Sequence, residues 1–302
     1  MEKKIYLYLC GGLGNQLFQY AAAKNIALKN NAKLILDTST GFISDFRDFW
    51  KFSLNKKKLK NVRYKKIIFI FILFKLFKKI FKPKNIFFKF FSNNLINEMN
   101  LNKFSKKING FKIKKNLYLF GYFQSEKYFN ENSNKIIAEL LPIKTNNKNF
   151  LNIKKKIVKT NSISIGVRLH ETMPKKINYK IGGITSINFY ERAIKKMLKH
   201  VKNPEFFIFS TKNENIKKLF SKVKELRRYP FNIITKEEGY DGSAYDNLWL
   251  MSFCKNHIIS NSTFYWWAAY FSKYRYKNQK IICSGNFPNR DTCFRDWKLE
   301  LK

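Results

Sequence analysis

Four small polar residues, Ser260 to Thr263, lie between an apolar run and an aromatic, alanine-containing segment of this 302-residue chain. The run His257–Ser260 predicts a strand, and the segment from Phe264 onward predicts a helix. A polar turn between a strand and a helix presents unpaired backbone N–H groups and the positive end of the helix dipole. Because the hydroxyls of Ser262 and Thr263 add further donors, this stretch predicts a phosphate-binding site.

A glycine-rich turn near the start of the chain repeats this arrangement. Ile5–Leu9 predicts a strand, Gly11–Gln16 a turn and Leu17–Leu28 a helix. Glycines such as Gly12 and Gly14 allow a backbone to approach a ligand closely. Two such elements, one in each half of the chain, predict a ligand held between two α/β domains.

Arg168 follows the predicted strand Ser162–Val167 directly. Ligands of open parallel sheets bind at the carboxyl ends of the strands, so Arg168 and the turn at Ser262–Thr263 are expected to reach one cleft. A guanidinium is permanently charged and can bond two oxygens, which suits a diphosphate. An arginine in this position is equally compatible with a structural role.

Asp246 begins the predicted helix that precedes the strand His257–Ser260. One interpretation places its carboxylate beside a nucleotide, where it would pair with the two N–H donors on the edge of guanine. The other interpretation is that its charge interacts with the dipole at the start of the helix. The sequence leaves both interpretations open.

Predicted strands alternate with segments of helical periodicity along the second half of the chain. Apolar residues between 190 and 201 recur at steps of three and four, which indicates an amphipathic helix. This alternation predicts parallel sheets and an α/β fold, and an Asn- and Lys-rich stretch near 142–160 predicts a linker. The further predicted strands are Lys33–Asp37, Lys115–Phe123, Phe206–Ser210, Asn232–Thr235 and Lys280–Cys283.

The chain is strongly basic, with 60 Lys and Arg against 20 Asp and Glu and a formal net charge of +40. An anionic partner would explain this charge: a membrane, a nucleic acid or a phosphorylated substrate. Codon bias in an AT-rich genome is the alternative explanation, because Lys, Asn, Ile and Phe are all abundant.

The cysteines, the N-terminus and the apolar runs indicate in which cellular compartment the protein is expected. The four cysteines contain no C-x-x-C pair, which favours buried reduced thiols over a zinc or redox site. The N-terminus does not resemble a signal peptide, and no apolar run approaches the roughly 20 residues that span a bilayer. These features predict a cytoplasmic protein.

Residues 51–91 form a distinct basic segment. Fourteen Lys or Arg occur between 51 and 89, and no acid occurs between Asp48 and Glu98. The eight apolar residues Ile67–Phe74 lie within it. One interpretation is a basic amphipathic helix that lies on anionic lipid; the other is a pair of core-facing helices with solvated lysines. The lysines at helical spacing after the apolar run are Lys75, Lys78, Lys79 and Lys82.

Three motifs resemble those of the bacterial α-1,2-fucosyltransferases of glycosyltransferase family 11. The first is Gly11–Ala21, and the second is the Gly-Tyr-Phe-Gln sequence at Gly121–Gln124, followed by Tyr128 and Phe129. The order and spacing of all three motifs agree with the family across nearly the whole chain. The third motif comprises Leu250–Ser252, Cys254, Ile258–Phe264 and Trp266–Ala269.

The resemblance implies two Rossmann-like domains in a GT-B-like architecture. Residues 1–155 would form an acceptor-side domain with a basic amphipathic insert at about 51–91, and residues 156–302 a GDP-sugar-binding domain. The implied reaction is an inverting, metal-independent transfer of L-fucose from GDP-L-fucose to the 2-hydroxyl of a galactose in a surface-glycan precursor. A lipid-linked precursor, feeding lipopolysaccharide or capsule, would place the protein on the inner face of the bacterial inner membrane.

The family pattern also implies roles for individual residues. Arg168 would hold the β-phosphate of GDP, and Ser262 and Thr263 would lie beside the same phosphate. Asp246 would read guanine, and Asn15 would line the donor cleft from the N-terminal domain. No cofactor is implied, because the GDP-sugar is itself a substrate.

The chain departs from the family pattern around Arg168. Family members usually carry His-x-Arg-Arg-x-Asp where this chain has Gly166–Glu171, so the first Arg is kept as Arg168 and the His position is Gly166. Two acids commonly follow the serine that is Ser210 here, and this chain has Thr-Lys instead. GDP-fucose is therefore the first choice of donor, and another GDP-sugar such as that of colitose is the alternative.

The general base is not identified by the sequence. Glu171 and His170 are the candidates near the expected cleft, and Glu171 could instead orient Arg168. A non-catalytic peripheral membrane or nucleic-acid-binding protein is a further alternative, supported by the charge and by 31 Phe and 16 Tyr. Outside 51–89 the basic residues are spread out and no aromatic-basic RNA motif occurs, so nucleic acid is not an expected partner.

Overall fold

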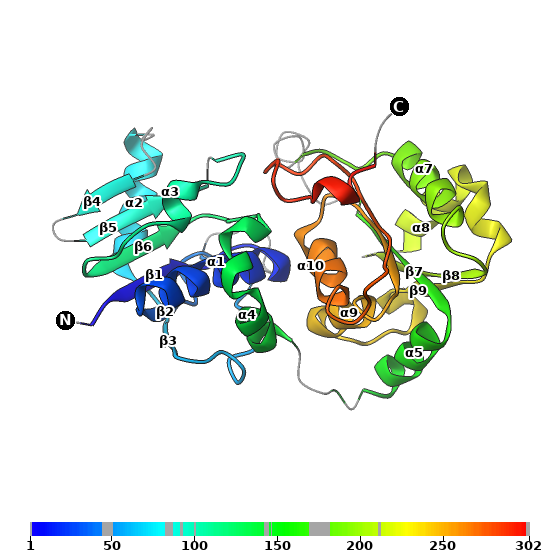
Figure 1. Cartoon of the computed structure of the whole chain (residues 1–302), viewed down its shortest axis with the longest axis horizontal. Coiled ribbons are helices and arrows are strands. Elements are labelled where there is room, and N and C mark those ends of the chain that lie inside the picture. Colours follow the sequence, from blue (N-terminus) through cyan, green and yellow to red (C-terminus); the bar gives the residue numbers. More distant parts are fainter. Residues whose placement is uncertain are drawn as a thin grey trace. The chain divides into compact units, whose positions relative to one another are not determined.

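The computed structural model describes residues 2–43, 51–81, 87–90, 93–99, 101–141, 145, 147–168, 182–210 and 213–299. The chain forms two compact units, Met1–Leu141 and Pro142–Lys302 (Figure 1). Each unit is built on its own β-sheet. The boundary expected between residues 155 and 156 falls inside a helix of the second unit, Lys148–Lys159.

The sheet of the first unit has the strand order β3-β2-β1-β6-β5-β4. All neighbouring strands are parallel except β4, which is antiparallel to β5. The order reverses at β1, which pairs with β2 on one side and β6 on the other. The strands are β1 (Lys4–Tyr8), β2 (Lys33–Asp37), β3 (Val62–Lys65), β4 (Phe87–Phe90), β5 (Asn93–Asn97) and β6 (Asn116–Phe120).

Helix α2 (Phe69–Phe81) covers one face of this sheet with an aromatic core cluster. Phe71 and Phe74 are fully buried and pack with Tyr8 of β1 and Tyr118 of β6. The Phe71 ring meets the Tyr8 ring at 5.4 Å and the Tyr118 ring at 5.9 Å, both edge to face. The other helical elements are α1 (Leu13–Asn30), α3 (Lys106–Asn109), η1 (Glu126–Tyr128), η2 (Asn130–Asn132) and α4 (Ser133–Leu140).

The sheet of the second unit is wholly parallel, in the order β11-β10-β7-β8-β9. The order reverses between β7 and β10, which are neighbours although residues 168–255 separate them in the sequence. The strands are β7 (Asn161–Val167), β8 (Pro204–Ser210), β9 (Phe231–Ile234), β10 (Asn256–Ile259) and β11 (Ile281–Cys283). The prediction of an α/β fold with two Rossmann-like, largely parallel sheets is confirmed.

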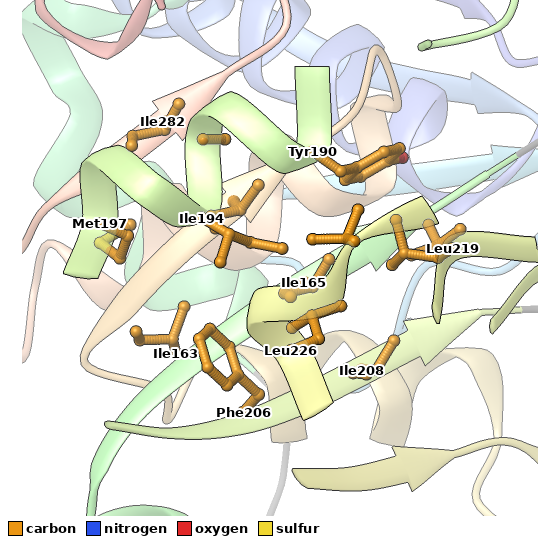
Figure 2. Packing of buried hydrophobic residues seen from close by; sticks show 14 of the residues in the cluster. Ile163, Ile165, Tyr190, Ile194, Met197, Phe206, Ile208, Leu219, Leu226 and Ile282 are labelled. Carbon is orange, nitrogen blue, oxygen red and sulfur yellow. The ribbon is translucent and has the colours of Figure 1, made fainter. Parts of the chain in front are cut away.

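A hydrophobic core lies between this sheet and helix α7 (Ile187–Leu198), as Figure 2 shows. Tyr190, Ile194 and Met197 of α7 pack with Ile163 of β7 and Phe206 of β8. The predicted amphipathic helix of this region is therefore present, and the Ser186 hydroxyl caps it by accepting the N–H of Phe189. The remaining helical elements are α5 (Lys148–Lys159), α8 (Asn213–Lys222), η3 (Lys224–Arg228), η4 (Lys236–Glu238), α9 (Ala244–Met251), α10 (Thr263–Ser272) and η5 (Arg295–Trp297).

The structure differs from what the sequence led us to expect in two regions, residues 51–91 and residues 142–160. Within 51–91, the described residues form β3, α2 and β4, so the expected insert supplies two strands and a helix to the α/β fold of the first unit. Lys75 of α2 is half-buried and donates from Nζ to the backbone oxygen of Thr40 at 3.3 Å, so it does not extend into solvent. The linker expected near 142–160 is largely helix α5.

Candidate active site

Arg168 and the start of helix α10 follow two neighbouring strands of the second unit. β7 ends at Val167 and β10 ends at Ile259, and the register pairs Ile259 with Gly166. Arg168 and the turn at Ser260–Thr263 therefore both lie at the carboxyl ends of the parallel strands. The strand order reverses between these strands, which is where open α/β sheets bind ligands. Two features that the sequence singled out are thus brought together.

Tyr265 of α10 holds the end of β7 immediately before Arg168. Its hydroxyl donates to the backbone oxygens of Val167, at 3.0 Å, and Phe209, at 3.1 Å. A Cβ atom on Gly166 would lie 2.5 Å from the Tyr265 ring, so only glycine leaves room for that ring. Gly166 is the position at which the family pattern has histidine.

Tyr190 holds the same strand from the opposite helix layer. Its hydroxyl donates to the backbone oxygen of Gly166 at 3.1 Å, and the side chain is fully buried. Sequence reasoning assigned Tyr190 to the apolar face of a helix and gave Tyr265 no role. The only hint of a role for Tyr265 in the sequence was the glycine at position 166, where the family has histidine. That glycine can be explained only once the structure shows that the Tyr265 ring packs against it.

The start of α10 has the features expected of an anion-binding terminus. Ser262 is the N-cap residue, and its side chain makes no capping hydrogen bond. The first backbone bond of the helix runs from the Trp266 N–H to the Ser262 oxygen at 2.9 Å. The earlier N–H groups of the helix and its dipole therefore point out of the helix start, toward the place where an anion would bind.

Asn261 ties the turn before α10 to residues 183–185. Its side-chain oxygen accepts from the Thr185 hydroxyl at 3.2 Å, and its amide donates to the Gly183 oxygen at 2.9 Å. Asn261 and Thr185 are both buried. The turn at the strand end is thus fixed by side-chain bonds, which keeps the Ser262 and Thr263 hydroxyls in a defined place.

Asp246 is the acidic residue of a capping box at the start of α9. Its Oδ2 accepts from the Ser243 N–H at 3.0 Å and from the Ser243 hydroxyl at 2.7 Å, and its own N–H donates to that hydroxyl at 3.1 Å. This bonding corresponds to the structural interpretation of Asp246. Buried Tyr240 lies close by: its pKa is raised by burial and by the charges of Asp246 and Asp241.

The glycine-rich turn of the first unit meets the Gly-Tyr-Phe-Gln motif at the ends of the paired strands β1 and β6. The Gln124 amide donates to Asn15 Oδ1 at 3.0 Å, and Gln19 donates to the Gly121 oxygen at 3.1 Å. Gly12 is the N-cap of α1, and Gly14 and Asn15 lie in its first turn. Asn15 is therefore held by a residue more than one hundred positions away.

Buried Glu98 supports the same motif and was not singled out from the sequence. Its Oε2 accepts the N–H groups of Tyr122 and Phe123, each at 2.9 Å. Phe123 has a φ of 51°, a left-handed conformation that is uncommon outside glycine. Burial raises the pKa of Glu98 to about 8, against the opposing effect of the two N–H donors.

The candidate bases His170 and Glu171 lie outside the described residues. His257 is fully buried between two serine hydroxyls, a packing role within the second unit. All four cysteines are buried and form no disulfide. Over the described part of the chain, no group of three or more His, Cys, Asp or Glu is placed to hold a metal ion, and no helix has the length and hydropathy to cross a membrane.

Comparisons with known proteins agree along nearly the whole chain. The family model described as glycosyl transferase family 11 matches residues 4–289. An α-1,2-colitosyltransferase of Escherichia coli is 32% identical over 272 residues, covering 88% of this chain and 87% of that protein. The O-antigen biosynthesis glycosyltransferase WbnK of Escherichia coli is 30% identical over 298 residues, covering 93% of each chain.

A solved structure supports the same fold. A variant of Arabidopsis thaliana FUT1 in complex with GDP aligns with a TM-score of 0.50 at 13% identity, covering 89% of this chain and 68% of that one. The two α/β units have a GT-B-like fold. With a family model that spans residues 4–289 and two relatives at 30% identity or more, the chain belongs to glycosyltransferase family 11.

Proposed function

We propose that this protein transfers a sugar from a GDP-sugar to a hydroxyl of a galactoside in a surface-glycan precursor, with inversion and without a metal. The observation that carries the proposal is the meeting of Arg168 and the α10 N-terminus at the ends of β7 and β10. A permanent cation that follows one strand end, close to a helix N-terminus that follows the neighbouring strand end, suits the diphosphate of a sugar nucleotide. Membership of family 11 and the name of the O-antigen relative support the glycan acceptor.

The proposed chemistry depends on stabilising the leaving group. The bond between the sugar C1 and the diphosphate breaks while an acceptor hydroxyl attacks the opposite face, and negative charge develops on GDP. Arg168 and the donors at Ser262 and Thr263 would stabilise that charge, and losing such a contact typically lowers the rate about 10²–10³-fold. Tyr265 contributes by fixing the backbone that carries Arg168.

The proposed donor is GDP-L-fucose, transferred to the 2-hydroxyl of galactose, and the alternative is the GDP-sugar of colitose. The alternative is supported by the 32%-identical relative named as an α-1,2-colitosyltransferase. Both hydrogen bonds from Ser243 go to Oδ2 of Asp246. In this proposal the other carboxylate oxygen, Oδ1, accepts hydrogen bonds from guanine. Asn15, with Gly12 and Gly14, contacts the donor from the first unit.

The base and the acceptor complete the proposal. His170 or Glu171 would accept the proton of the attacking hydroxyl, since both follow Arg168 closely in the sequence. The acceptor would be lipid-linked, and the protein would lie on the inner face of the bacterial inner membrane. The name of the O-antigen relative and the basic segment 51–91 support this placement.

The test is GDP release, with mass spectrometry of the products, from purified protein given lactose and either GDP-fucose or GDP-colitose. We expect one donor to yield a glycosylated product, and Arg168→Ala to lower the rate about 10²–10³-fold by removing charge stabilisation of the leaving group. Arg228→Ala, an exposed arginine of the same unit, is the matched control and should keep the wild-type rate.

Three outcomes would argue against parts of the proposal. Near wild-type turnover in folded Arg168→Ala would remove that residue from the mechanism. Thermal stabilisation by GDP over UDP without product from either donor would argue against these two donors or against lactose as acceptor, and would point to another GDP-sugar or a lipid-linked acceptor. Equal stabilisation by UDP and GDP would contradict the role of Asp246 in reading guanine.

A further inference from the structure

The outer face of helix α2 is apolar, although it faces solvent. This outer face consists of Phe69, Leu73 and Leu76, whose side chains are 67%, 45% and 55% exposed. Ile67, just before the helix, is 51% exposed. A helix on the surface of a soluble domain normally carries polar residues on this side, so a run of large exposed apolar residues marks a contact surface.

The opposite side of α2 is buried against the hydrophobic core of the first unit. Phe71 and Phe74 are completely buried against the sheet of the first unit, and Ile68 is buried with them. Residues 69, 73 and 76 are separated by four and three positions, so they share one face of the helix. The helix therefore has two apolar faces, and only one of them is used within the unit.

The charged residues that directly precede α2 in the sequence are basic. Arg63 and Lys65 of β3 and the following Lys66 are exposed directly before α2. The sequence from Asp48 to Glu98 contains no other acid to balance them. An apolar face with adjacent positive charge is complementary to the surface of an anionic bilayer, where acyl chains lie beneath negative headgroups.

We propose that the outer face of α2 inserts into the interface of an anionic lipid bilayer, with Arg63, Lys65 and Lys66 against the headgroups. This inference deepens the proposed placement at a membrane and rests on it for its biological setting. The contact differs from the one expected from the sequence in its basic residues, because Lys75 of α2 is half-buried and the headgroups would meet Arg63, Lys65 and Lys66 instead. The sheet fixes the angle of the helix through Phe71 and Phe74.

A second copy of the chain fits this face less well. Two identical faces in a symmetric dimer would place the basic residues of one copy near those of the other. The protein as a whole carries a net charge of +40, which further opposes self-association at low ionic strength. An anionic lipid surface relieves this repulsion, whereas a second copy increases it.

The test is co-sedimentation of the full-length protein with vesicles of phosphatidylcholine and phosphatidylglycerol in equal parts. Leu73→Ser/Leu76→Ser should weaken vesicle binding at least about tenfold, because two apolar side chains no longer enter the bilayer. The matched control is Leu151→Ser/Val158→Ser on α5, two apolar residues that are each 44% exposed. Neither pair changes the net charge, so any difference between them is not electrostatic.

Lys65→Gln/Lys66→Gln tests the electrostatic part of the proposal. These substitutions should weaken binding to the mixed vesicles while leaving the weak binding to phosphatidylcholine vesicles unchanged. Circular dichroism establishes that each variant is folded. GDP release with soluble lactose should be equal in the α2 variant and the wild type. This assay tests sugar transfer and the vesicle assay tests membrane binding, so the two proposals can fail independently.

Three results would overturn the inference. The first is no vesicle binding by the wild type, and the second is equal loss of binding in the α2 and α5 variants. The third is a dimer, seen by light scattering, that Leu73→Ser/Leu76→Ser dissociates without affecting vesicle binding. That result would assign the outer face of α2 to a second copy of the chain.

Discussion

Arg168 depends on residues that are distant in the sequence. Its charge comes from its own side chain, but its backbone follows a strand end that Tyr265 and Tyr190 hold through the oxygens of Val167 and Gly166. Gly166 is required because the Tyr265 ring occupies the volume that a side chain would fill.

Tyr265→Phe tests this arrangement with the loss of one oxygen atom. We expect the free energy of unfolding to fall by about 1–3 kcal/mol, because the buried oxygens of Val167 and Phe209 lose their donor. GDP affinity should fall as well, since the strand end before Arg168 is no longer held. Urea unfolding and calorimetric titration with GDP measure the two effects.

Tyr274→Phe provides the control for this substitution, because Tyr274 is 44% exposed. It should leave both the stability and the GDP affinity near the wild-type values. Unchanged stability and GDP affinity in Tyr265→Phe would show that the hydroxyl is dispensable for holding the strand end.

At the scale of elements, His257 joins two strands and a helix of the second unit. Its Nδ1 lies 2.7 Å from the Ser164 hydroxyl of β7, and its Nε2 lies 2.8 Å from the Ser272 hydroxyl of α10. Burial, together with a smaller effect of the charge of Arg275, lowers the pKa of His257 to about 3 against the opposing effect of the Cys254 backbone. The imidazole is therefore neutral in the folded protein over the physiological range.

Because the pKa of His257 is lowered on folding, we expect the free energy of unfolding to fall in acid. The unfolded chain takes up a proton on His257 below about pH 6.5, whereas the folded protein does not until about pH 3. The stabilisation is thus complete above pH 6.5 and is lost as the pH falls toward 3, by about 1.4 kcal/mol per pH unit. Urea unfolding measured from pH 7 down to about pH 5 gives the slope.

His257→Gln is the comparison, because glutamine can bond both serines and does not titrate. Its free energy of unfolding should decline less steeply below pH 6.5 than that of the wild type. Equal slopes in the two proteins would mean that His257 is protonated in the folded state. A His257 ring signal that shifts between pH 7 and 5 in NMR spectra would lead to the same conclusion.

At the scale of the whole molecule, the proposed contacts are divided between the two units. Arg168, Asp246, Ser262 and Thr263 all belong to Pro142–Lys302, whereas Asn15 and the outer face of α2 belong to Met1–Leu141. Each unit has its own sheet and its own core clusters. Nucleotide binding is therefore expected to reside in the second unit, and membrane binding in the first.

The fragment 142–302 tests this division. We expect it to fold and to bind GDP within about tenfold of the full-length affinity, because its core is internal and it carries the proposed phosphate and guanine contacts. It should release no GDP in the lactose assay, since the first unit is missing. Circular dichroism and calorimetry measure folding and binding. A folded fragment without GDP binding would assign essential nucleotide contacts to the first unit.

The sequence by itself determined the alternation of strands and helices in the second unit, several elements of the first unit and the location of the two turns. Strands such as Lys33–Asp37 and the helix around Tyr190 follow from hydrophobic periodicity, and the glycine-rich and Ser-Thr turns follow from local backbone chemistry. The motifs resembling family 11 also lie in the sequence. These features were readable because each depends on residues within a few positions of one another.

The tertiary structure decided which side chains meet and which remain exposed. It paired Gly166 with Tyr265, bonded Asp246 to Ser243 as a helix cap, and supported the Gly-Tyr-Phe-Gln motif with buried Glu98. It also buried Phe71 and left the opposite, apolar side of α2 exposed, although the lysines had suggested a basic solvent face. A helical pattern fixes which residues share a face, but only packing against the sheet decides which face turns inward.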